Sequence, residues 1–127
     1  MNTAKRVLIP LLCIAICLGS LRSVFFFGYV PSSSMEPALK KGSVIFGYRK
    51  FKTLRNGDII VFQKDGRLLV KRVAASHDEI VTIGEETVTV PEDCFYVLGD
   101  NQENSYDSRY WSSPFVPLSD VVAKIFG

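Results

Sequence analysis

An uncharged apolar run near the N-terminus constrains this chain more than any other feature. The run VLIPLLCIAICLGSL (7–21) contains no charged residue, and the apolar character continues beyond Arg22 to Val30. A helix that crosses a bilayer needs about 20 mostly apolar residues. A span would therefore include Arg22, whose long side chain can reach the headgroups. The sequence predicts one transmembrane anchor at 7–26, after a short cytoplasmic segment at 1–6.

A cleaved secretory signal is the alternative interpretation of the same run. Lys5 and Arg6 followed by an apolar stretch fit the first two regions of a signal peptide. The cleavage region fits poorly, because the tripeptide at 18–20 begins with leucine where a small residue is wanted. We therefore expect an uncleaved anchor. Basic residues lie on both sides of the run, so charge alone barely decides its orientation.

Short β-rich runs separated by turn residues follow the apolar segment. Asp65-Gly66, a dipeptide typical of hairpin turns, separates two of them. Many short strands with tight turns are typical of an antiparallel sandwich or barrel. We predict a mainly β fold, with one N-terminal transmembrane helix and a compact antiparallel β-sandwich or barrel-like domain at 27–127. The expected strands are 43–49, 58–63, 67–75, 79–84, 86–90, 94–99 and 121–126.

Composition argues against two classes of site. The chain has 15 Lys and Arg against 13 Asp and Glu, a net charge of +2, which makes no case for nucleic acid as a partner. The cysteines are Cys13, Cys17 and Cys94, the only histidine is His77, and no pair has the spacing of metal ligands. We expect no metal and no other cofactor, and an exposed His77 in a polar turn.

Two polar segments interrupt the strand pattern. PSSSMEPAL (31–39) holds three serines between two prolines, and each proline fixes its own φ angle and restrains the residue before it. GDNQENSYDSRYW (99–111) is dense in Gly, Asp, Asn and Ser, which predicts a loop. By composition alone, both segments are typical of solvated connections.

One predicted strand, RLLVKRVAA (67–75), contains two charges among apolar residues. Alternation puts Lys71 and Arg72 on opposite faces, and because both faces are otherwise apolar it leaves open which charge points inward. A buried lysine has a lowered pKa, and its neutral amine can take a proton from a serine hydroxyl. The alternative is an edge strand, where lysines commonly block aggregation.

Together these segments resemble the bacterial type I signal peptidases, membrane-anchored serine proteases that remove signal peptides from exported proteins. Four segments are similar to family boxes and occur in the family's order: PSSSMEPAL (31–39), GDIIVF (57–62), VKR (70–72) and GDNQENSYDSR (99–109). The single anchor and small size resemble the Gram-positive forms. The segment between Lys71 and Gly99 is too short for the extra β-domain of larger members.

The resemblance implies a role for each residue of these boxes. Ser34 is the nucleophile, and Lys71 is the general base. Ser32 and the backbone N–H of Ser34 form the oxyanion hole, and Ser105 orients the lysine amine. Four charged residues are expected to support this arrangement: Arg72, Asp100, Asp107 and Arg109.

The resemblance also implies substrates and a location. The substrates would be secretory preproteins, cut after small side chains and bound as an extended strand beside the segment before Ser34 and the strand of Lys71. The protein would lie in the bacterial cytoplasmic membrane, with its catalytic domain on the extracytoplasmic side. Its partners would be these preproteins, the lipid bilayer and the protein-export machinery.

Three other functions remain open from the sequence. One is a specialised Ser-Lys peptidase of a pilus or conjugation system, and another is a self-cleaving peptidase of the SOS-repressor type. The third is a membrane assembly factor without catalytic activity. Intact Ser34, Lys71 and Ser105 weigh against the third.

Overall fold

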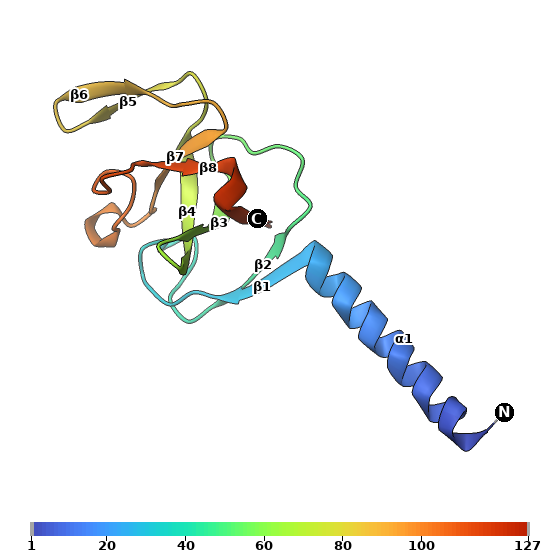
Figure 1. Cartoon of the computed structure of the whole chain (residues 1–127). Helices are drawn as coiled ribbons and strands as arrows, with labels where there is room; N and C mark the ends of the chain where they lie inside the picture. Colours follow the sequence, from blue (N-terminus) through green and yellow to red (C-terminus); the bar gives the residue numbers. More distant parts are fainter. Residues whose placement is uncertain (1, 127) are drawn as a thin grey trace.

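The structure is a computed structural model that describes residues 2–126, as one helix followed by a β-domain (Figure 1). Helix α1 (Thr3–Val24) projects from the domain, and none of its residues is buried. Its 22 residues extend over about 33 Å at 1.5 Å each, and it is apolar enough to cross a membrane. The predicted N-terminal apolar helix is confirmed, whereas the membrane boundaries at 7–26 stay a prediction.

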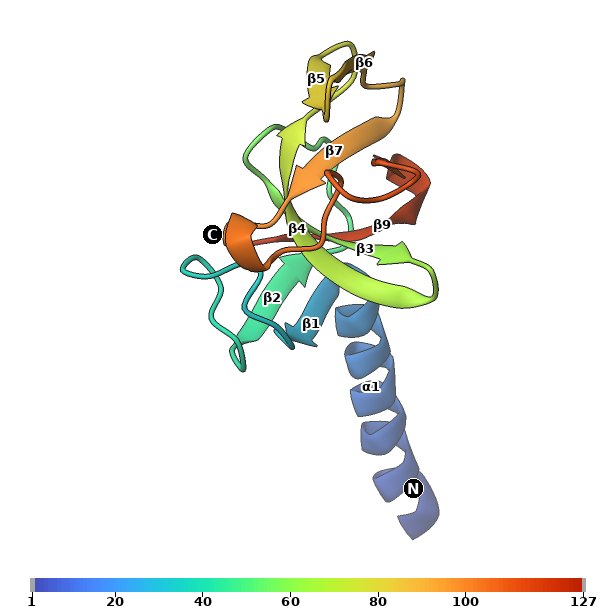
Figure 2. The ribbon, with the colours of Figure 1, turned by 90° about the vertical axis from the view of Figure 1, so that its left-hand side faces the viewer.

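Nine strands follow the helix within the described residues, and seven of them form one antiparallel sheet in the order β1-β2-β9-β3-β4-β7-β8. These seven are β1 (Phe25–Tyr29), β2 (Val44–Tyr48), β3 (Ile59–Lys64), β4 (Arg67–Ala75), β7 (Cys94–Leu98), β8 (Phe115–Pro117) and β9 (Val121–Ile125). The remaining two, β5 (Ile80–Ile83) and β6 (Glu86–Thr89), form a hairpin at the end of the domain opposite to the helix (Figure 2). Short 3-10 turns occur at η1 (Gln102–Asn104) and η2 (Leu118–Asp120).

The mainly β, antiparallel fold predicted from the sequence is confirmed, and each expected run forms a strand. Strands β1 and β8 were not expected. The aromatic residues of β1 continue the apolar run of the helix without a turn signal, so the sequence does not mark where the helix ends. In the structure Phe25 has an extended backbone and pairs with Tyr48 of β2, and this pairing starts the sheet.

The core packs on both faces of the central strand β3. Ile60 and Phe62 belong to a hydrophobic cluster on one face, together with Trp111, and Val61 belongs to a second cluster on the other. Successive strand residues point to opposite faces, so burial of all three means that both faces are covered. Strand β3 pairs with residues 67–72 of β4, which places Lys71 beside Ile60 at the margin of the core.

We predict that Phe62→Ala lowers the free energy of unfolding by about 3–5 kcal/mol, because it leaves a cavity in the centre of the sheet. The measurement is urea unfolding of the full chain in detergent. The control is Ile80→Ala, since Ile80 is 71% exposed and its loss should change the stability by less than about 0.5 kcal/mol. Similar losses for the two variants would contradict the described core.

Candidate active site

The serine triplet forms a ledge, residues 32–34, that is tied to the loop at 99–111. The backbone N–H of Asn101 donates to the carbonyl oxygen of Ser34 at 2.9 Å. The side-chain amide of Asn101 donates to the carbonyl oxygen of Ser33 at 3.1 Å. Ser34 itself is buried, and so is the next residue, Met35. The interpretation of 31–39 as a solvated connection therefore fails at Ser34 and Met35, which are buried, although both ends of the segment remain open to solvent.

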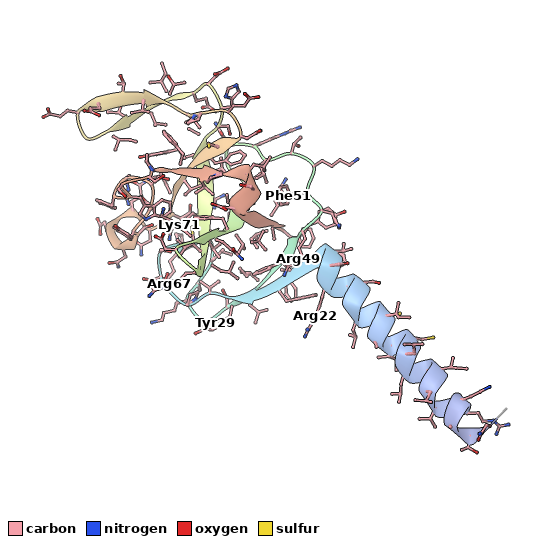
Figure 3. All side chains as sticks on the ribbon, viewed as in Figure 1. Arg22, Tyr29, Arg49, Phe51, Arg67 and Lys71 are labelled. Carbon is pink, nitrogen blue, oxygen red and sulfur yellow. The ribbon has the colours of Figure 1, made fainter. Side chains whose placement is uncertain are left out.

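Lys71 meets Ser34 at this ledge. Its Nζ lies 2.7 Å from the Oγ of Ser34, although the two residues are 37 positions apart in the sequence. Lys71 is only 5% exposed, whereas the Arg72 side chain is 35% exposed, so the lysine is the charge that points inward. The interpretation of Lys71 as an exposed edge-strand lysine that blocks aggregation is wrong, because Lys71 is buried against Ser34. Figure 3 shows Lys71 within the β-domain, away from the helix.

Burial sets the protonation of Lys71. Removal from water disfavours the ammonium form and lowers the pKa of Lys71, while the negative charge of Asp107 opposes this shift in part. The net direction is downward, so Lys71 is neutral at a lower pH than an ordinary lysine. An uncharged amine beside a hydroxyl can accept its proton.

Ser32 lies next to both the backbone and the side chain of Ser34. Its Oγ is 3.4 Å from the backbone nitrogen of Ser34, which donates to it, and 3.2 Å from the Oγ of Ser34. The Ser32 hydroxyl and the Ser34 N–H therefore lie side by side. Two such donors suit a carbonyl oxygen that gains negative charge during a reaction at Ser34.

Ser105 lies on the loop in close contact with Gly99. Its buried Oγ has no hydrogen-bond partner among the residues that the structure describes. A Cβ atom at position 99 would overlap the side chain of Ser105 and come within 2.7 Å of the carbonyl oxygen of Ser34. Only glycine therefore lets the loop, Ser105 and the serine ledge approach one another this closely.

One ion pair holds the loop at 99–111 to strand β4, and another joins two residues within the loop. Arg72 on β4 binds Asp100 through two contacts of 2.8 and 2.7 Å, a bidentate pair. Asp107 is fully buried, accepts from the backbone N–H of Gly99 at 3.0 Å and pairs with Arg109 at 2.8 Å. Burial alone would raise the pKa of Asp107, but the hydrogen bonds from Arg109 and Gly99 outweigh it and hold this pKa below its usual value.

The loop at 99–111 is thus not a solvated connection, contrary to its composition. Three of its residues that have no assigned role from the sequence are structurally important: Gly99 and Asn101, described above, and Ser108. Ser108 is fully buried, and its Oγ accepts from the backbone N–H of Val97 at 2.9 Å. All three lie inside the segment that carries the family resemblance, and that resemblance is the only signal that marks them.

A small cavity of about 250 Å³ adjoins Ser34 and Lys71. Its walls come from the β1 end of the domain and from β4, and they include Val30, Val61 and Val70. The largely apolar walls suit an apolar side chain. His77 is exposed, as expected, and pairs with its neighbour Asp78. Within residues 2–126, no group of three or more His, Cys, Asp or Glu side chains gathers in a way that could hold a metal ion.

Comparison with known proteins identifies the family of this site. The family model described as "Signal peptidase, peptidase S26" matches residues 2–90 and 76–126, which include every site residue described above. The chain belongs to the signal peptidase family. The resemblance to type I signal peptidases that the sequence motifs indicate is therefore confirmed.

Relatives of this signal peptidase family occur in bacteria and in a plant. The probable signal peptidase I-2 of Synechocystis sp. is 30% identical over 77% of this chain and 60% of its own length. The probable signal peptidase I-1 of the same organism is 30% identical over 90% of this chain and 76% of its own length. The chloroplastic thylakoidal processing peptidase 1 of Arabidopsis thaliana is 25% identical over 75% of this chain and 39% of its length. The chain thus spans well under the full length of these relatives.

We predict that Gly99→Ala destabilises the protein by about 1–3 kcal/mol, because the new methyl group overlaps Ser105 and approaches the backbone of Ser34. The matched control is Gly19→Ala in α1, where no atom lies within 4 Å of the added Cβ. That variant should keep its stability or gain up to about 1 kcal/mol. Chemical unfolding of both variants checks this, and a harmless Gly99→Ala would mean that the loop packs less closely than described.

Proposed function

We propose that this chain is a membrane-anchored serine endopeptidase that removes N-terminal signal peptides from exported preproteins. The observation that carries the proposal is the 2.7 Å contact between Lys71 Nζ and Ser34 Oγ in a buried setting, in a chain of the signal peptidase family. A serine beside a desolvated lysine has both the nucleophile and the base that peptide hydrolysis requires.

In this mechanism Lys71 carries one proton in each half of the reaction, first from Ser34 to the leaving nitrogen and then from water to Ser34. The Oγ of Ser34 attacks the peptide carbonyl carbon as its proton moves to the neutral amine of Lys71. The resulting ammonium gives that proton to the leaving nitrogen when the C–N bond breaks, and an ester on Ser34 remains. Lys71 then takes a proton from water, the hydroxide attacks the ester, and the proton returns to Ser34 as the new carboxyl end departs.

Two donors would stabilise the oxyanion of each tetrahedral intermediate. They are the Ser32 hydroxyl and the Ser34 N–H, which now contact each other. A substrate carbonyl oxygen would replace that weak contact with two stronger ones. Loss of one such donor costs about two to three orders of magnitude in rate.

Ser105 and the charged pairs would act by positioning. The buried Oγ of Ser105 has no partner among the described residues, so it is free to bind the lysine amine. Asp107 would hold the loop through Gly99 and Arg109, and the Arg72–Asp100 pair would hold it to the strand of Lys71.

The substrate would bind as an extended strand between two open strand edges. Strand β1 is an edge strand of the sheet. Strand β7 pairs with β4 only from Arg72 to Ala75, so residues 67–71 of β4 have no β7 partner on that side. A peptide placed along these edges would direct alternate side chains into the 250 Å³ cavity. Its largely apolar walls support uncharged residues at the first and third positions before the cut, where the family resemblance implies small ones.

The helix α1 supports a location at the membrane. We assign residues 1–6 to the cytoplasm, the predicted anchor to the bilayer as far as Val24, where α1 ends, and the β-domain to the outer face of the bacterial cytoplasmic membrane. Arg22 lies at the end of the helix that joins the β-domain (Figure 3), the position expected for a side chain that reaches lipid headgroups. Preproteins emerging from the export machinery would meet the site there.

We predict that Ser34→Ala and Lys71→Ala each reduce preprotein cleavage by about four to six orders of magnitude, since each removes half of one catalytic unit. The measurement is cleavage by detergent-solubilised full chain, with mass spectrometry to locate the cut after a small residue. His77→Ala is the control and should retain full activity, because His77 is exposed in a turn away from the pair. Cleavage that survives either dyad variant, or no cleavage by folded wild type across several preproteins, would refute the proposal.

We predict that the rate rises with pH as Lys71 loses its proton, with a midpoint below the ordinary lysine pKa of about 10.4. Asp107 raises the pKa of Lys71, so the isosteric variant Asp107→Asn should move this midpoint to lower pH. Initial rates between about pH 5 and 11 measure both. A midpoint at the ordinary lysine value, or an upward movement in the variant, would contradict a desolvated base that faces Asp107.

A further inference from the structure

A hollow of about 510 Å³ lies between the β2–β3 loop and strand β9, away from Ser34 and Lys71. Three lysines belong to its wall: Lys50, Lys52 and Lys124. We propose that this hollow binds the headgroup of an anionic phospholipid from the membrane that α1 crosses. The inference rests on the proposed function in one respect, because it assumes that α1 spans a bilayer.

The β2–β3 loop is fixed beside the end of the helix. The backbone N–H of Arg49 donates to the carbonyl oxygen of Val24 at 2.7 Å, and the Nε of Arg49 donates to that of Phe25 at 3.3 Å. Val24 is the last residue of α1, and consecutive Cα atoms are about 3.8 Å apart. Lys50 therefore begins close to the level at which the helix leaves the membrane. Figure 3 shows Arg49 and Phe51 on the side of the domain that joins the helix.

The hollow carries more positive charge than its own acidic group offsets. Among the described residues of its wall, Asp58 is the one acid. Its carboxylate already pairs with Lys124 at 3.4 Å and accepts from the backbone N–H of Arg55 at 2.8 Å. Lys50 and Lys52 are exposed and form no ion pair with any residue from 2 to 126. Two ammonium groups thus remain free to bind an anionic headgroup.

An apolar hollow of about 590 Å³ adjoins the basic one on the side of the helix. Its wall includes Leu21 of α1 and Phe25, and Ile125 and Phe126 line both hollows. The rings of Phe25 and Phe126 lie 6.3 Å apart between centroids, and Phe126 is 56% exposed. A ligand that fills both hollows needs an anionic end and a long apolar end. A phospholipid has both, because its acyl chain gains from leaving water and its headgroup carries the charge.

The opposite end of the domain carries the opposite charge. Between residues 73 and 108 the chain contains acidic residues and neither lysine nor arginine. This segment includes the β5–β6 hairpin, which lies at the end of the domain opposite to the helix (Figure 2). An anionic membrane surface attracts basic residues near it and repels acidic ones. The separation of charge along the domain therefore favours a negatively charged membrane as the partner of the basic hollow.

The test measures which lipid stays bound to the full chain. Wild type in a nonionic detergent receives equal amounts of phosphatidylglycerol and phosphatidylcholine with the same acyl chains, and native mass spectrometry distinguishes the two adducts by mass. We expect a preference for phosphatidylglycerol of about 5- to 30-fold, the range that one or two basic residues give at about 1 kcal/mol each near an anionic surface. The loop variant, Lys50→Gln/Lys52→Gln, should lose most of this preference. Equal retention of the two lipids by wild type would overturn the proposal.

Matched variants separate the hollow from a general effect of charge. Lys64→Gln/Arg67→Gln removes the same charge at the β3–β4 turn and should keep the preference, because Figure 3 shows Arg67 far from Phe51. Phe126→Ala should weaken the retention of both lipids alike, since Phe126 lines the hollow for the acyl chain. Soluble glycerol phosphate, which has no acyl chain, should not displace the bound lipid. A preference that survives in the loop variant, or that the β3–β4 variant loses equally, would overturn the proposal, and so would displacement by glycerol phosphate.

Cleavage in lipid-free detergent distinguishes this inference from the proposed function. Lys50 and Lys52 lie outside the candidate active site, so the loop variant should cut a preprotein at the wild-type rate, which would show that its loss of lipid is local. If wild type prefers phosphatidylglycerol but cuts no preprotein, the lipid site stands and the peptidase assignment fails. If wild type cuts preproteins but retains both lipids equally, the lipid site is wrong and the peptidase assignment stands.

Discussion

The site depends on keeping the Lys71 side chain away from water. An ammonium group at a position with 5% exposure is costly, and the cost is relieved when the amine gives up its proton. Strand β3 covers one side of the lysine through Ile60, and Ser34, on the ledge that the loop at 99–111 holds, covers another. The ion pairs and the glycine contact of that loop thus help to keep a single amine buried.

Charges within the loop have opposite effects on the protonation of Lys71. Asp107 is the buried carboxylate of the loop, and its charge works against the neutral state of Lys71. Arg109 and the backbone N–H of Gly99 offset the negative charge of Asp107 through direct contacts with its carboxylate. The balance lets a rigid, fully buried acid hold the loop while the lysine nearby still has a lowered pKa.

Local signals predicted most of the fold, because each expected strand is an apolar run between turn residues. The sequence could not resolve the start of the sheet, since Phe25, Phe26 and Phe27 suit a membrane helix and a strand equally well. Only pairing with β2 decides between these states, and pairing is a long-range contact. The direction of Lys71 was undecided for a similar reason: both faces of β4 are apolar, and the contact that distinguishes them comes from the ledge at Ser34.

The motifs predicted which residues gather at the site, but the reason for their spacing appears only in three dimensions. Gly99 and Asn101 have no side chain that suggests chemistry at this site. Their importance lies in a close approach and in two hydrogen bonds to the serine ledge, and no local pattern encodes either. Composition failed at this loop because its polar residues bind one another and the backbone instead of water.

Because α1 joins β1 directly, the length of the helix sets both the height and the rotation of the domain. Val24 ends the helix, Phe25 begins the strand, and Arg49 clamps the joint through the carbonyl oxygens of both. With no slack between them, one residue added to α1 would lift the domain by about 1.5 Å and turn it by about 100° about the helix axis. The number of residues in the helix therefore sets the distance of the Ser34 site from the start of the helix. It also sets the direction in which the site faces about the helix axis.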